Sequence, residues 1–68
     1  METSARNQLQ GSVTSVTVGA VMAEVVVDIG GAQVVAAITK ESAERLGLAA
    51  GMSVTAIIKA TDVMVGVG

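Results

Sequence analysis

Few side chains in this sequence can take part in chemistry. Its 68 residues include no histidine, no cysteine and no aromatic side chain. These absences exclude a Ser-His-Asp triad, a thiol nucleophile, a haem ligand and an iron–sulfur cluster, and they leave no ligand set typical of structural zinc. The remaining side chains can carry charge or donate hydrogen bonds, but they do not suit redox or group-transfer chemistry. We therefore expect a binding protein rather than an enzyme, with no cofactor and no directly coordinated metal ion.

Two cationic side chains stand at the ends of expected strands. Arg6 lies in the segment Ser4-Ala5-Arg6-Asn7-Gln8, just before the first strand, and Lys59 ends a later strand before the turn Ala60-Thr61-Asp62. A guanidinium is a planar fork of hydrogen-bond donors, and the hydroxyl of Ser4 adds another donor. Each segment could bind an anion, with a solvated N-terminal arm and an ordinary strand-end lysine as the alternatives.

Ser42 and Gly19 are further candidates for contact with an anion. Ser42 falls in the first turn of the only expected helix, where backbone N–H groups lack partners and the helix dipole is positive. Gly19 lies in an expected turn, where a missing side chain lets backbone N–H groups approach a ligand. Both also have ordinary explanations, because serine is common in first turns and glycine in tight turns. Glu24 and Asp28 lie roughly 13 Å apart along one strand, which is too far for an acid–base pair acting on one bond.

Valine-rich segments with a period of two residues predict the elements that hold these side chains. The chain contains 13 valines but only three leucines, which is typical of strands. We expect tight hairpins at Gly19-Ala20, of type II′, and at Gly30-Gly31. A helix is expected over Lys40–Leu46, with Thr39 as N-cap and Gly47 as the left-handed residue after its end. The expected strands are Asn7–Val18, Val21–Ile29, Ala32–Thr39, Ser53–Lys59 and Val63–Val67.

This order of elements predicts a mainly β fold, a five-stranded OB-like barrel with one short helix between strands 3 and 4. A single domain over residues 1–68 is small, and such a chain buries only about 60% of the surface that it exposes when unfolded. The strand at 32–39 is apolar on both faces and must be covered twice. Because neither a disulfide nor a zinc site can stabilise the chain, we expect a homo-oligomer.

Charge and hydropathy narrow the choice of partners. The net charge is −2 with four basic residues in all, which argues against a nucleic-acid surface. The sequence contains no run of about 18 predominantly apolar residues that could span a membrane. The N-terminal segment lacks the basic residues and apolar core of a signal peptide, so the expected location is the cytoplasm.

The whole chain resembles the molbindins, small cytoplasmic proteins made of one Mop domain of the TOBE type. The resemblance rests on Ser4-Ala5-Arg6-Asn7-Gln8-Leu9, on Ser42 followed by Leu46-Gly47-Leu48 and Gly51, and on Lys59-Ala60-Thr61-Asp62-Val63. It implies a five-stranded OB-like barrel, strands exchanged between subunits, and a homohexamer built as a trimer of dimers. It also implies that molybdate or tungstate binds between subunits, and that the protein stores and buffers these oxyanions.

The resemblance further implies oxyanion contacts at seven positions. Because Ala60 stands where some relatives have serine, one hydroxyl donor is missing and the site is expected to be weaker. The contacts of the family carry over to Ser4, Arg6, Ser42, Lys59 and the backbone N–H of Ala60, while the hairpin at Gly19 and Ala20 is expected to add backbone amides.

Two other functions stay open. A DNA-binding transcription regulator of the AbrB type also has a short helix followed by Leu-Gly-Leu and a downstream glycine, similar to Glu44-Arg45-Leu46-Gly47-Leu48. The net charge argues against this alternative, because phosphate contacts need more than four basic residues per chain. The other alternative is a structural oligomerisation module without a ligand, which a binding assay would distinguish.

Overall fold

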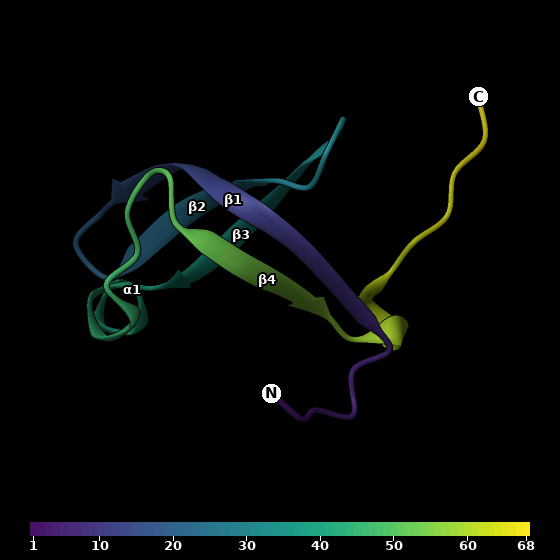
Figure 1. Cartoon of the computed structure of the whole chain (residues 1–68), viewed down its shortest axis with the longest axis horizontal. Coiled ribbons are helices and arrows are strands. Elements are labelled where there is room, and N and C mark those ends of the chain that lie inside the picture. The colour runs from purple at the N-terminus through teal and green to yellow at the C-terminus, as the bar shows by residue number, and fades with distance from the viewer.

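Four strands, one α-helix and one 3₁₀ turn follow one another in the computed structural model, which describes residues 1–68 (Figure 1). The helix lies between the third and fourth strands, as expected. No helix in the structure is long and apolar enough to cross a membrane. The elements are β1 (Asn7–Val18), β2 (Met22–Asp28), β3 (Gln33–Thr39), α1 (Lys40–Leu46), β4 (Ser53–Ile58) and the 3₁₀ turn η1 (Ala60–Asp62).

The four strands form one antiparallel sheet in the order β3-β2-β1-β4. β1 is long enough to pair with two neighbours: its first half, from Asn7 to Ser12, pairs with β4, and its second half, from Ser12 to Val18, pairs with β2. A bulge at Thr14 interrupts the second ladder, and the Thr14 hydroxyl donates to the carbonyl oxygen of Val26 at 3.1 Å. The sheet curls along its length. The prediction of a mainly β, OB-like fold with one short helix is confirmed.

The prediction of a fifth strand is wrong, because the sheet has four strands. Residues 63–67 form no strand, and after η1 the chain runs away from the sheet (Figure 1). Alternation of valine predicts a segment that can be a strand, but such a segment needs an unpaired sheet edge within reach. β3 and β4 remain the two edges of the sheet, so the barrel stays open between them.

The turn and helix signals in the sequence are largely confirmed. Thr39 caps α1, and Gly47 ends it in the left-handed conformation with φ of 64°. Gly30 and Gly31 both have positive φ at the tight hairpin between β2 and β3. The type II′ turn at Gly19 is wrong, because Gly19 does not have positive φ.

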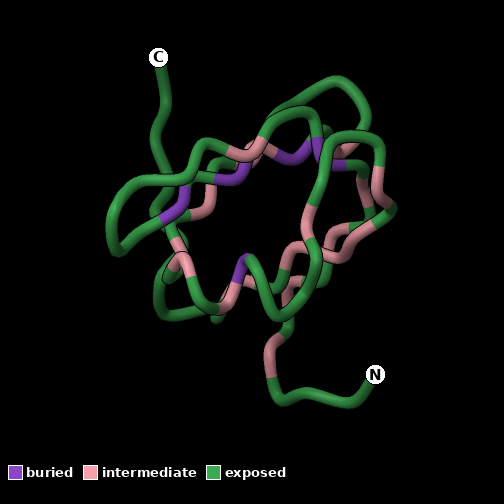
Figure 2. The backbone as a smooth tube through the Cα atoms, turned by 90° about the vertical axis from the view of Figure 1, so that its left-hand side faces the viewer, coloured by how far each residue is buried: buried purple, intermediate pink, exposed green.

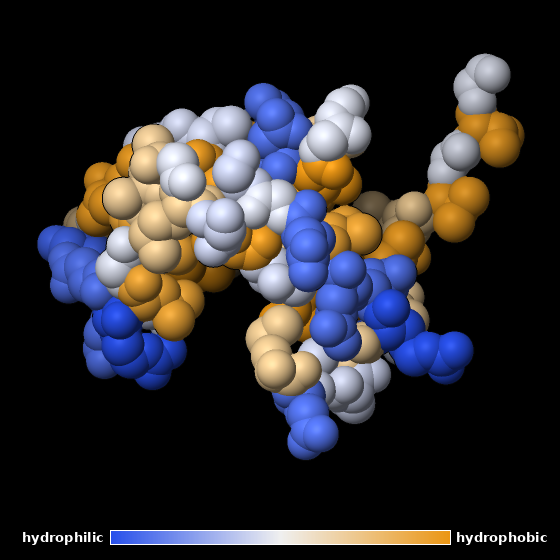
Figure 3. All heavy atoms as spheres, viewed as in Figure 1, coloured by the Kyte–Doolittle hydropathy of each residue, from blue (hydrophilic) through white to orange (hydrophobic).

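The core of one chain is small. Only five of the 68 residues are buried: Val13, Ala23, Val25, Val27 and Ala43. Figure 2 shows these positions spread around the inside of the curled backbone. The apolar residues of the C-terminal tail contribute nothing to this core, since Met64 and Val65 are more than nine-tenths exposed. Figure 3 shows the tail standing clear of the body of the molecule.

The crossing of strands near Gly11 generates a stability prediction. A Cβ atom at position 11 would overlap the carbonyl oxygen of Asp28 and would lie 3.0 Å from Cγ1 of Val27. We expect Gly11→Ala to lower the free energy of unfolding by about 1–3 kcal/mol, because the backbone of β2 must move away. Ser12→Ala, at the exposed next residue, is the control and should change little. Urea denaturation measures both, and an unchanged midpoint for Gly11→Ala would contradict the close approach.

Candidate anion-binding site

Arg6 and Lys59 both lie at the end of the β1–β4 ladder. Asn7 and Ile58 form the last pair of this ladder, and Arg6 and Lys59 are the residues that directly adjoin this pair on the two chains. Both cations are exposed, and the only ion pair in the structure joins Lys40 to Glu44 at 4.0 Å. Like charges placed opposite each other across a ladder repel. An anion between Arg6 and Lys59 would relieve this repulsion.

Ser4 and Ala60 adjoin the same end of the sheet. Two hydrogen bonds shape the arm that carries Ser4: the N–H of Ala5 donates to the Thr3 hydroxyl at 3.2 Å, and the Gln8 amide donates to the Ala5 carbonyl at 3.1 Å. Ala60 begins η1, and no side chain caps this turn. Since the first N–H groups of a helical turn lack partners within it, the N–H of Ala60 can donate to a ligand. We call Ser4, Arg6, Lys59 and Ala60 the cationic end.

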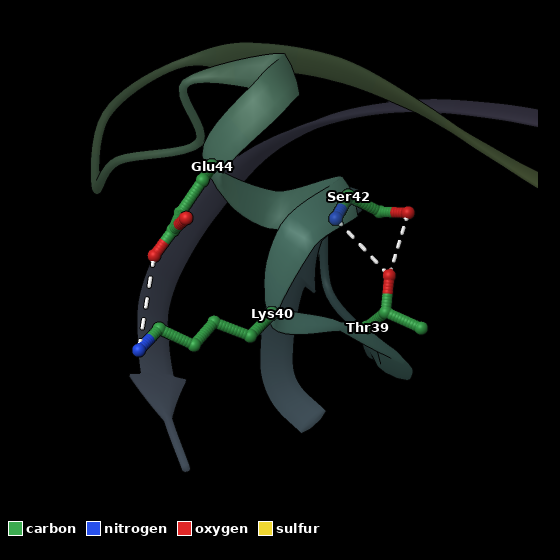
Figure 4. A network of polar contacts seen from close by, with 4 residues as sticks. All are labelled: Thr39, Lys40, Ser42 and Glu44. Carbon is green, nitrogen blue, oxygen red and sulfur yellow. Dashed lines mark hydrogen bonds and ion pairs between the residues drawn. The ribbon is translucent and has the colours of Figure 1, made fainter. Parts of the chain in front are cut away.

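The remaining candidates lie together at the other end of β1. The N–H of Lys40 donates to the carbonyl of Val21 at 2.7 Å, which joins the start of α1 to the β1–β2 hairpin. Figure 4 shows the hydroxyl of Thr39 accepting from the N–H of Ser42 at 3.0 Å and donating to the Ser42 oxygen at 2.8 Å. In this arrangement the proton of the Ser42 hydroxyl is free for another acceptor. We call Gly19, Ala20, Thr39 and Ser42 the hydroxyl end.

The hairpin contributes less than the sequence suggests. The N–H of Gly19 donates to the carbonyl of Met22 at 2.7 Å, so this amide is already used within the turn. The N–H of Ala20 has no such partner and stays available. Of this pair, Ala20 is therefore the residue whose N–H can donate to a ligand, whereas the N–H of Gly19 cannot.

Thr39 is a candidate that sequence reasoning missed. The sequence identified it only as the helix N-cap, a role that the structure confirms. The sequence did contain a signal for a second role of Thr39. An N-cap hydroxyl reaches the residue three positions later, and in this chain that residue is Ser42. Two hydroxyls at this spacing predict a hydrogen-bonded pair.

The two ends are too far apart to hold one small ion within one chain. Twelve residues of β1 lie between them, a path of roughly 35 Å at strand rise. Figure 1 shows the start of β1 and η1 at one side of the molecule and the β1–β2 hairpin with α1 at the other. Each end alone supplies an incomplete set of donors. The cationic end lacks the paired hydroxyls, and the hydroxyl end has no cation among the candidate residues.

Comparisons with known proteins place the chain in a family. The model of the TOBE domain matches residues 3–65. Molybdenum-pterin-binding protein 3 of Clostridium pasteurianum is 52% identical over 66 residues, which cover 96% of this chain and 97% of that protein. A molybdate-binding protein from Sporomusa ovata has a similar structure, with a TM-score of 0.91, 45% identity, and coverage of 96% of this chain and 97% of the other.

A longer protein contains the same fold. The cytoplasmic molybdate-binding protein ModG, solved with molybdate bound, superposes with a TM-score of 0.92 and 42% identity over all of this chain and 49% of its own. The match to the domain model and the similarity to relatives along almost the whole length agree with the fold described above. The chain therefore belongs to the TOBE-domain family, and within it to the Mop proteins, or molbindins.

Proposed function

We propose that this protein binds molybdate or tungstate and stores and buffers these oxyanions in the cytoplasm. The observation that carries the proposal is that Arg6 and Lys59 adjoin the last pair of the β1–β4 ladder and that neither forms an ion pair with a carboxylate. Relatives of nearly the same length are named for binding molybdenum-pterin or molybdate, and ModG is described as cytoplasmic. These names support molybdate as the anion that the two cations attract.

The donor set suits a tetrahedral dianion. Molybdate has four oxygens that only accept hydrogen bonds, so its site needs N–H and O–H donors with limited positive charge. Arg6 and Lys59 offset the two charges, and bonds from cations to an oxyanion are roughly twice as strong as neutral ones. Ser4, Ser42, Thr39 and the amides of Ala20 and Ala60 are the neutral donors. None of these groups is arranged to transform a ligand, and we infer binding without catalysis.

We infer that the complete site forms between subunits. Because one chain keeps its cationic end and its hydroxyl end apart, the cationic end of one subunit must meet the hydroxyl end of another. In a two-fold pair such a contact occurs twice, so each dimer carries two equivalent sites. The hexamer implied by the resemblance, a trimer of dimers, would repeat this pair three times.

The C-terminal tail supports assembly through exchanged strands. Val63, Met64, Val65 and Val67 are between 48% and 101% exposed, although the segment is almost wholly apolar. The open side of the sheet offers two unpaired edges and an apolar groove between them, lined by Val34, Ala36 and Ile38 of β3 and by Val54, Ala56 and Ile58 of β4. A tail from a second subunit can pair with such an edge and bury its valines in the groove.

Two other ligands are less well supported. The AbrB-type alternative is not favoured, because the four basic residues are divided between the two ends of the sheet and form no continuous stripe. Several relatives are named for binding molybdenum-pterin. A flat heteroaromatic ring usually stacks on aromatic side chains, and this chain has none. We therefore propose the free oxyanion as ligand.

The first prediction from the proposed function concerns Arg6 and Lys59. We expect Arg6→Ala and Lys59→Ala each to weaken molybdate binding by at least about tenfold, or about 1.4 kcal/mol, because each removes a charge-assisted hydrogen bond. Arg45→Ala, at the exposed last turn of α1, is the matched control and should bind like the unmodified chain. Titration calorimetry with molybdate, tungstate, sulfate and phosphate measures all of these. Wild-type affinity in both cation variants would contradict the proposed site.

The second prediction tests whether the site is shared. Arg6→Ala and Ser42→Ala damage opposite ends, so each variant alone should bind molybdate weakly. When the two are unfolded together and refolded, half of the dimers are mixed, and each mixed dimer has one site with both ends intact. We expect about a quarter of the sites to regain full affinity. A site made within one subunit predicts no recovery, and calorimetric stoichiometry distinguishes the two results.

The third prediction concerns the tail. We expect Val65→Asp to dissociate the oligomer and to weaken molybdate binding, because a carboxylate cannot enter the apolar groove without a partner. Gly68→Asp adds the same charge beyond the apolar run and is the control. Sedimentation equilibrium measures the assembly of both variants. An intact oligomer with Val65→Asp would rule out burial of the tail against another subunit.

A further inference from the structure

Asn7 forms the last side-chain connection before the two cations. It is half-buried at the start of β1, and its amide nitrogen Nδ2 donates to the carbonyl oxygen of Ile58 at 3.2 Å. The two residues lie 51 positions apart in the chain. Each directly adjoins one of the cations, Asn7 following Arg6 and Ile58 preceding Lys59. This hydrogen bond therefore joins the two segments that carry the charges.

The position of the bond gives it a mechanical role. Beyond the pair of Asn7 and Ile58 the ladder ends, and both chains leave the sheet, one as the N-terminal arm and the other as η1. Strand ends separate readily where no further rung holds them, and repulsion between Arg6 and Lys59 acts in the same direction. A side chain that crosses the ladder at its last pair opposes both effects.

We propose that Asn7 is a positioning residue for the oxyanion site, which sets the spacing between Arg6 and Lys59 by clamping the ends of β1 and β4. This inference rests on the function proposed above. It extends that function by assigning a residue that governs the selectivity between oxyanions of different size. Two donors held at a fixed separation fit one size of tetrahedral oxyanion, whereas donors that move independently adapt to several. Sulfate is a smaller dianion than molybdate and is the natural competitor for such a test.

The test compares three variants of the full-length chain in calorimetric titrations with molybdate and with sulfate. Asn7→Leu removes the donor at similar size, and Asn7→Asp keeps the shape but replaces the donor by a negatively charged acceptor. This charge repels molybdate and sulfate alike, so the ratio of the two affinities is the readout for Asn7→Asp. Gln10→Leu is the matched control, because it removes an exposed amide from the same strand that makes no hydrogen bond to the protein. Sedimentation and thermal melting of each variant establish that it is folded and assembled.

We expect both Asn7 variants to bind molybdate at least about fivefold more weakly, the equivalent of about 1 kcal/mol. They should also show a smaller ratio of molybdate to sulfate affinity, while Gln10→Leu leaves both values unchanged. An unchanged ratio, whether or not molybdate affinity falls, overturns the positioning role. Should Asn7→Leu fail to fold, Asn7→Asp decides alone. Failure of the unmodified chain to bind molybdate would instead overturn the proposed function, and the assignment of Asn7 with it.

Discussion

The length of β1 is the constraint on which the rest of the structure depends. One strand of twelve residues serves two neighbours in succession, β4 along its first half and β2 along its second. The exchange of partners at Ser12 requires β2 to pass close to the backbone of β1, and Gly11 supplies the necessary space. The same length carries the cationic residues to one end of the molecule and the hydroxyl residues to the other. Within one chain, the cationic end and the hydroxyl end cannot approach each other unless the sheet breaks.

This separation couples ligand binding to assembly in the arrangement that we propose. A ligand that is held by two subunits favours the associated state, since its binding energy is available only there. The small core also favours association, because a single chain with five buried residues has little apolar burial to stabilise it.

Local signals in the sequence predicted most of the fold because they depend on neighbouring residues only. Thr39 and Gly47 mark the two ends of α1, and paired glycines at 30 and 31 mark a hairpin, each through backbone geometry. The tail at 63–67 shows the limit of this reasoning. Its alternation predicts a strand, but the partner edge is a property of the assembled sheet. The position of Arg6 and Lys59 at one end of the sheet likewise depends on the pairing of Asn7 with Ile58, between segments more than fifty residues apart.

The candidate site was predictable in its members more than in its arrangement. Ser4, Arg6, Ser42 and Lys59 stand out by residue type and position, but only the structure divides them between two ends and shows that Thr39 pairs with Ser42. The open sheet gives this division a further consequence. The unpaired edges of β3 and β4, which are rich in apolar residues, could otherwise pair with other chains in an uncontrolled way. In the assembly that we propose, a tail that covers these edges in a partner subunit would bring the two ends of the binding site together by the same contact. In that assembly, protection of the edges and completion of the proposed site are one structural requirement.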